Sequence, residues 1–197
     1  MEFRKLPMVL LALTFLNLAA FLAAPYTIPP GTVRNLDGNA NMVDYGDLWA
    51  ELPLLPRIVY TVGDFNCHQR ADRSFHLNGN QMPMCARCAG LNVGFFLGSL
   101  ALMMTIPSGD IFRSSLTPIL GKRAITMERK YAIALSLGMG FIVLAPMVLD
   151  GLVQALTDYE STNAMRLVTG TVFGAALVYA LGIYMESMLF EPGTGKP

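Results

Sequence analysis

Residues 85–106 read CARCAGLNVGFFLGSLALMMTI, and this stretch decides the fold that we expect. Its 22 residues would span about 33 Å as a helix, which is enough to cross the hydrocarbon of a bilayer. Small residues recur at every fourth position and form one flat face of such a helix: Ala86, Gly90, Gly94 and Gly98. A second helix can approach this face closely. We therefore predict a membrane-spanning helix that packs against another helix through its small residues.

The composition of the whole chain is typical of a membrane protein. Of its 197 residues, 53% are hydrophobic and only 14% are charged, whereas soluble domains have about 25% charged residues. The apolar residues are also gathered into blocks, so the lipid bilayer is the expected environment. The formal net charge is zero, and no attraction to nucleic acid is expected.

Three further apolar blocks approach the ~20 residues that cross a bilayer, and they cover residues 6–24, 131–149 and 163–190. We therefore predict an all-α fold, a polytopic bundle of four transmembrane helices with a cysteine-rich loop at the outer face. The first block begins like a secretory signal peptide. Bulky Phe21 or Leu22 lies close before the small-residue cleavage site, and Pro25 follows it. We therefore expect this helix to remain uncleaved.

Basic residues beside the blocks indicate the orientation. Arg4 and Lys5 precede the first block, and five more lie between the second and third: Arg113, Lys122, Arg123, Arg129 and Lys130. Basic residues of short flanks stay on the cytoplasmic side. We therefore predict a multi-pass protein of the cell membrane with both termini in the cytoplasm. Residues 67–88 and 150–163 then share the outer face, where they can form one site.

Five short motifs lie in and beside these two segments. They read Cys67-His68-Gln69, Arg73-Ser74-Phe75, Cys85-x-Arg87-Cys88-x-Gly90, Asp150-Gly151-x-x-Gln154 and Glu160-Ser161-Thr162-Asn163-x-x-Arg166. In this order they resemble the small archaeal and bacterial membrane proteins grouped as domain of unknown function 2085. The resemblance covers roughly residues 60–185. It implies a membrane protein, and it implies no activity.

The chain then divides into three parts. Residues 1–60 hold the first helix and an extracytoplasmic loop, residues 61–190 hold the family core with the Cys/His loop and three transmembrane helices, and residues 191–197 form a disordered tail. Within the first loop, residues 47–62 are apolar enough to lie along the membrane surface. Their prolines argue against a regular helix there.

Three thiols and an imidazole predict a metal site. Cys85 and Cys88 can present two sulfurs to one ion, and Cys67 with His68 would complete a set of three cysteines and one histidine. A closed tetrahedral set of this kind suits zinc. Gln69, with Ser74 and Phe75, is expected to order the loop that carries the ligands.

The fourth ligand and the charge of this site remain open at this stage. Because adjacent residues strain simultaneous ligation, His76 or Asp150 is an alternative to His68, although His76 lies outside the motifs. A water in the fourth position would make the site catalytic. Three thiolates and one zinc ion leave a net charge of about −1, which Arg73 and Arg87 beside the ligands would offset.

The same cysteines allow a second function, which is thiol-disulfide exchange. Cys85 and Cys88 lie at the expected start of a helix, where the helix dipole and Arg87 lower the pKa of a thiol. A bridge between them would form in an oxidising compartment, with Cys67 as the resolving thiol. Quinone is the electron acceptor that membrane oxidoreductases of this general plan use, so it enters only under this alternative.

A third alternative is a protein that binds an anionic lipid, a headgroup or another small molecule. Arg73, Arg87 and Arg166 would hold the anion. Hydroxyl groups of the ligand would contact three further side chains: Asp150, Gln154 and Asn163. Asp150 or Glu160 is the candidate general base if such a ligand is also a substrate. No motif specifies a reaction, so the sequence leaves open whether the protein is an enzyme.

Plainer structural roles remain for several of these residues. Arg166 can simply pair with Asp150 or Glu160 to satisfy a buried charge. Residues 160–163 can be no more than the start of a helix, with a hydroxyl or amide side chain as the N-cap.

Overall fold

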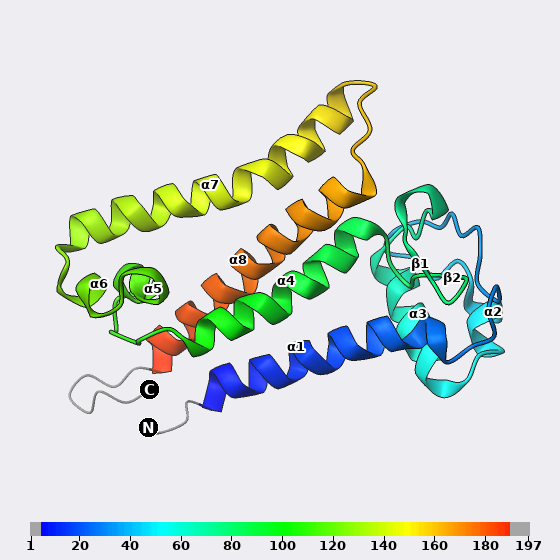
Figure 1. The fold of residues 1–197 in the computed structure, drawn as a ribbon, viewed down its shortest axis with the longest axis horizontal. Coiled ribbons are helices and arrows are strands. Elements are labelled where there is room, and N and C mark those ends of the chain that lie inside the picture. The colour runs from blue at the N-terminus through cyan, green and yellow to red at the C-terminus, as the bar shows by residue number, and fades with distance from the viewer. Residues whose placement is uncertain (1–4, 190–197) are drawn as a thin grey trace.

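The computed structural model describes residues 5–189 of the chain (Figure 1). The structure is 71% helical and has almost no strand, which confirms the predicted all-α class. The predicted tail, residues 191–197, lies outside the described residues.

Four helices in the described part of the chain are long and apolar enough to cross a membrane. They are α1 (Lys5–Ala23), α4 (Ala86–Met103), α7 (Arg129–Leu156) and α8 (Asn163–Leu189). Large apolar side chains on them point away from the protein, since Leu13 is 59% exposed and Phe141 is 76% exposed. Such surfaces are stable against lipid and not against water. The predicted polytopic four-helix bundle is therefore confirmed.

Helix α7 is longer than the apolar block that predicted it. The block covers residues 131–149, whereas the helix continues to Leu156. Two polar side chains of the added turns, Asp150 and Gln154, contact Arg87 of α4. Hydropathy alone could not show this extension, because the polar residues are accommodated by partners that are distant in the sequence.

Helices α4 and α8 form the closest helix pair, and their glycines are the reason. A Cβ atom added at Gly90 or Gly94 of α4 would overlap a backbone carbonyl oxygen of α8. A Cβ at Gly170 of α8 would likewise overlap the carbonyl oxygen of Arg87. The small-residue face expected on residues 85–106 is therefore the surface that packs against α8.

We expect Gly94→Leu to destabilise the bundle. The added side chain collides with the backbone of α8 near Thr171, so the two helices must separate, which costs about 1–3 kcal/mol or more. The thermal midpoint of the purified protein in detergent should fall. Gly138→Leu is the matched control, because nothing lies within 4 Å of a Cβ at this glycine of α7. An equal fall in both variants would contradict the assigned packing face.

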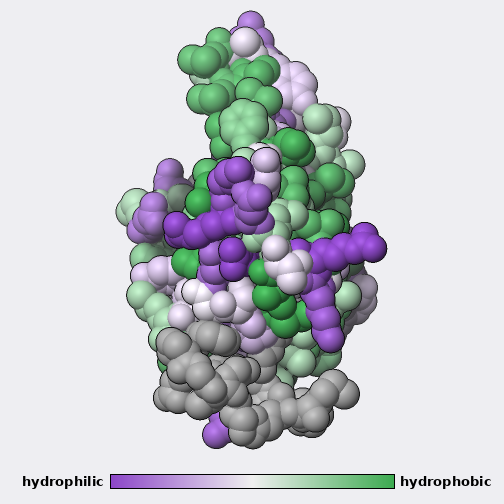
Figure 2. Space-filling model, turned by 90° about the vertical axis from the view of Figure 1, so that its left-hand side faces the viewer, coloured by the Kyte–Doolittle hydropathy of each residue, from purple (hydrophilic) through white to green (hydrophobic). Residues whose placement is uncertain are grey.

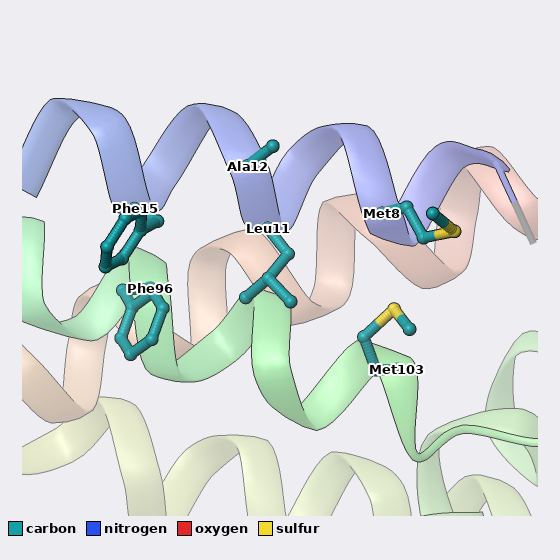
Figure 3. Close-up of a pocket in the computed structure, with 6 residues that line it drawn as sticks. All are labelled: Met8, Leu11, Ala12, Phe15, Phe96 and Met103. Carbon is teal, nitrogen blue, oxygen red and sulfur yellow. The ribbon is translucent and has the colours of Figure 1, made fainter.

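Helix α1 packs on α4 through aromatic rings and an asparagine pair, whereas α8 packs on α4 through glycines. The Phe15 and Phe96 rings lie 5.9 Å apart, and Asn17 donates a hydrogen bond to Asn92 across the two helices. Toward the start of α1 the helices leave an apolar pocket between them, lined by six residues: Met8, Leu11, Ala12, Phe15, Phe96 and Met103 (Figure 3). The asparagine pair holds helices together where lipid cannot offer hydrogen bonds.

Residues 27–84, which we call the cap, form a small folded unit at one end of the bundle (Figure 1). It contains α2 (Gly46–Ala50), α3 (Leu54–Asn66) and an antiparallel hairpin of β1 (His76–Leu77) and β2 (Asn80–Gln81). The fully buried Trp49 stacks on Tyr60 at 5.0 Å in its core, and the Trp49 indole donates a hydrogen bond to Asp64. The cap therefore has a core of its own.

Helix α3 corrects the expectation that prolines prevent a regular helix within residues 47–62. Pro53 precedes the helix and Pro56 is its third residue. The first four N–H groups of a helix have no partner within it, so a proline there removes no hydrogen bond.

The opposite end of the bundle holds the connection between α4 and α7. It contains two shorter helices, α5 (Ile111–Leu120) and α6 (Lys122–Thr126). Asp110 caps α5 by accepting a hydrogen bond from the Phe112 N–H at 3.0 Å. Figure 2 looks onto this end and shows hydrophilic side chains beside apolar ones. The start of α1 and the end of α8 lie at the same end (Figure 1).

Candidate functional site

Two buried amides bring the cysteine-bearing loops together. The Gln69 side chain donates a hydrogen bond to the carbonyl oxygen of Pro83 at 2.7 Å, and the Gln81 side chain donates one to the carbonyl oxygen of Gln69. Both glutamines are fully buried. Gln69 has a φ of 47°, a conformation that is held here by these side-chain bonds. The sequence motif contained Gln69, whereas Gln81 and its role were missed because a single buried glutamine has no sequence signal.

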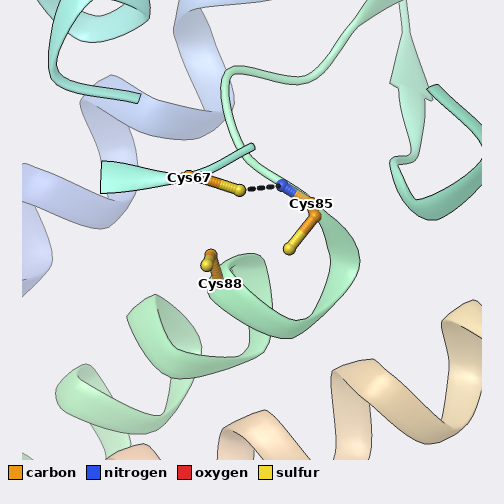
Figure 4. Close-up of side chains that lie close together, drawn as sticks. All are labelled: Cys67, Cys85 and Cys88. Carbon is orange, nitrogen blue, oxygen red and sulfur yellow. Dashed lines mark hydrogen bonds between the residues drawn. The ribbon is translucent and has the colours of Figure 1, made fainter. Parts of the chain in front are cut away.

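Three sulfur atoms meet where these loops join the bundle (Figure 4). Cys67 directly follows α3, Cys85 is the N-cap of α4, and Cys88 lies in the first turn of α4. All three Sγ atoms lie within 4.8 Å of one another, and none is in a disulfide. Cys67 and Cys85 are buried and Cys88 is half-buried. The structure therefore unites Cys67 with the Cys85/Cys88 pair, as the metal hypothesis requires.

Hydrogen bonds around the sulfurs favour a thiolate. The Sγ atom of Cys67 accepts the N–H groups of Cys85 at 3.3 Å and of Gln69 at 3.5 Å. Hydrogen bonds from Cys67 and then Cys88 lower the pKa of Cys85, and the His68 imidazole lowers it further. The hydrogen bond with Cys85 is the main cause that raises the pKa of Cys67 to about 11. Cys85 is therefore favoured over Cys67 as the thiolate of the cluster.

His68 lies beside this cluster in a defined orientation. Its Nδ1 accepts the backbone N–H of Arg70 at 3.0 Å, so the proton of the neutral ring is on Nε2. The imidazole then acts on Cys85 as a hydrogen-bond donor. Among the described residues, the ligand atoms within 4.8 Å of one another are the three sulfurs alone. The fourth-ligand roles of His68, His76 and Asp150 stay predictions.

Arg73 and Arg87 form ion pairs with the second segment. Arg73 Nη2 lies 2.8 Å from Glu160 Oε1, and Arg87 pairs with Asp150. Arg87 Nη2 also donates to Gln154 Oε1 at 3.5 Å. Asp150 and Gln154 therefore share one helix face, as their i, i+4 spacing indicates. The two arginines connect the cap and α4 to residues 150–160.

The start of α8 completes this connection. The Asn163 amide donates to the carbonyl oxygen of Asp72 at 3.3 Å and accepts from Arg166 Nη1 at 3.2 Å. Thr162 Oγ1 accepts the N–H of Met165 at 3.3 Å, so this threonine caps the helix. Residues 160–163 thus both begin helix α8 and contact the cap. Arg166 is 5% exposed and forms no ion pair with Asp150 or Glu160.

Comparison with known proteins places these motifs in a family. Residues 67–180 match a family described as a predicted membrane protein, domain of unknown function 2085. The chain belongs to this family. The match begins at Cys67 and includes both segments of the candidate site, residues 67–88 and 150–163. The predicted resemblance is confirmed.

Two archaeal relatives extend the comparison. An uncharacterised protein of Methanocaldococcus jannaschii is 31% identical over 129 residues, which cover 65% of this chain and 69% of the relative. An uncharacterised protein of Methanothermobacter thermautotrophicus is 28% identical over 111 residues, which cover 56% of this chain and 79% of the relative. No solved structure matches the chain.

Proposed function

We propose that the protein binds one zinc ion through Cys67, Cys85 and Cys88, and that the ion fastens the cap to α4. The observation that carries this proposal is the approach of all three sulfurs to within 4.8 Å. Sulfur atoms about 2.3 Å from a tetrahedral zinc ion are about 3.8 Å apart, so small side-chain adjustments suffice. Cysteine thiolates favour zinc over the hard cations calcium and magnesium.

The surroundings of the sulfurs support a bound ion. Two backbone N–H groups donate to Cys67, and the positive end of α4 lies at Cys85 and Cys88. These partial charges offset the net charge of about −1 that three thiolates and one zinc ion carry. Asp150 and Glu160, the candidate general bases, are both occupied by arginines. The fourth ligand decides the role of the ion, because a side chain such as His68 would close a structural site, whereas a water would make the site catalytic.

Elemental analysis with a count of reactive thiols tests this proposal. We expect about one zinc ion per chain in tag-free protein, and thiols that react only after a chelator removes the ion. A metal-free protein whose three thiols react at once would refute it.

A thiol oxidoreductase is the second candidate, and the lowered pKa of Cys85 at the start of α4 favours it. The same experiment separates the two functions. Protein without metal, with a Cys85–Cys88 bridge that reductants open, would establish the redox function and make a bound quinone the next component to measure.

We also propose that the cap lies outside the cell and that both termini lie in the cytoplasm. Lys122, Arg123, Arg129 and Lys130 lie at the end of the bundle opposite the cap. Basic flanks of this kind stay on the cytoplasmic side, so the cap is expected on the outer side. An impermeant maleimide should label Asp37→Cys in intact cells, because the Asp37 side chain is 76% exposed on the cap. Arg129→Cys, 67% exposed at the other end, should be labelled only in opened cells. The reverse pattern would invert the topology.

A further inference from the structure

Six buried side-chain atoms without a hydrogen-bond partner gather between the cap, α4, α7 and the start of α8. They are Arg73 Nε, Arg87 Nε, Arg166 Nη2, Asp150 Oδ1, Gln154 Nε2 and Ser161 Oγ. Hydrogen bonds link most of their residues, since Arg87 contacts both Asp150 and Gln154, and Arg73 contacts Glu160. Buried polar atoms are nearly always hydrogen-bonded in folded proteins, so a cluster of this kind indicates a missing partner.

The chemistry of these atoms specifies the partner. Five of the six are N–H or O–H groups that can donate hydrogen bonds, and only Asp150 Oδ1 can do nothing but accept. A ligand that satisfies them must offer several acceptor atoms close together. A phosphate group does so with its oxygens, and arginine is the side chain that best matches their geometry.

The charges point to the same ligand. Arg166 is 5% exposed, and its Nη1 donates a hydrogen bond to the neutral Asn163. The positive charges of Arg73 and Arg87 act unfavourably on it, whereas the carboxylates of Glu160 and Asp72 act favourably. Three guanidinium groups this close to one another are costly in a protein interior unless an anion joins them. Asp150 pairs with Arg87, and Glu160 and Asp72 pair with Arg73, so among the described residues Arg166 is the arginine of the three that has no carboxylate within ion-pair distance and that an anion would stabilise most.

The site has partly exposed and buried arginines. Arg87 and Arg166 lie in the first turns of α4 and α8, at the level where a membrane has its headgroups. The side chains of Arg73 and Arg87 are 23% and 26% exposed, whereas Arg166 and Ser161 are buried. A ligand from outside the protein would therefore meet Arg73 and Arg87 before Arg166.

We propose that Arg73, Arg87 and Arg166, with Gln154 and Ser161, form a binding site for a phosphate group at the cap end of the bundle. The phosphate is carried either by a free phosphate compound or by a lipid headgroup. The site uses none of the three sulfurs as a ligand, although Arg87 lies between Cys85 and Cys88 on α4.

Binding of inorganic phosphate to the full-length protein in a neutral, phosphate-free detergent tests the site. We expect saturable binding by calorimetry that weakens at least about tenfold in Arg166→Gln and in Arg73→Gln, because each variant loses a charge-assisted hydrogen bond. Arg70→Gln is the matched control, since Arg70 lies on the same loop and shares Asp72 with Arg73, but none of its atoms belongs to the six unpaired ones. Should Arg166→Gln fail to fold, the partly exposed Arg73 decides the result.

A second arm identifies the source of the phosphate. The thermal midpoint is compared in bicelles of phosphatidylcholine with and without phosphatidic acid. A rise with phosphatidic acid that Arg73→Gln abolishes and Arg70→Gln retains, without binding of inorganic phosphate, assigns the site to a lipid headgroup. The proposal is overturned if neither probe binds, or if Arg70→Gln weakens binding as much as Arg73→Gln does.

Discussion

Cys85→Ser is expected to lower the zinc content of the purified protein from about one ion per chain to near zero. Cys85 interacts with both other sulfurs, and a serine hydroxyl replaces a soft ligand with a hard one that zinc binds poorly. Removing a side chain that only hydrogen-bonds to a metal ligand lowers the metal affinity about 10–100-fold. Removing a sulfur ligand should therefore lower the zinc affinity more than about 100-fold.

The loss of the ion should also loosen the cap. Limited proteolysis should cut Cys85→Ser within residues 67–84 faster than the unchanged protein, while the bundle stays intact. Glu51→Ala is the control, because Glu51 is an exposed residue of the cap and lies outside the sulfur cluster. Retention of zinc in Cys85→Ser, or equal loss in Glu51→Ala, would show that the three sulfurs do not hold the ion.

Arg87→Ala is expected to lower the free energy of unfolding by about 3–5 kcal/mol, since it leaves a buried carboxylate without its charge partner. The Asp150 side chain is only 4% exposed and pairs with Arg87. The measurement is equilibrium unfolding in detergent. Removing both charges at once should cost less, because the double variant Arg87→Met with Asp150→Leu leaves no charge unpaired.

An exposed arginine of the cap provides the comparison for this pair. Arg70 pairs with Asp72, but both side chains are largely open to solvent, at 43% and 50% exposure. Solvent screens such pairs, so Arg70→Ala should change the unfolding curve little. If Arg87→Ala behaves like Arg70→Ala, the pair with Asp150 does not connect α4 to α7.

The metal hypothesis depended on a contact that the sequence could only suggest. The Cys85/Cys88 spacing is local, so the start of any helix would bring these two sulfurs together. Cys67 lies 18 residues before Cys85, and its approach requires the Gln69 and Gln81 side chains to tie two loops. The charges expected beside the sulfurs, Arg73 and Arg87, instead pair with Glu160 and Asp150.

The sequence by itself determined the parts of this protein that depend on neighbours along the chain. Apolar blocks of bilayer length specify spanning helices, and glycines four residues apart, such as Gly90 and Gly94, specify a face for close packing. Only the tertiary structure decided the contacts between remote segments. Arg87 and Asp150 are 63 residues apart, and Arg73 and Glu160 are 87 apart. Periodicity reports which face of a helix is buried, whereas the partner on that face depends on how all the helices and the cap pack together.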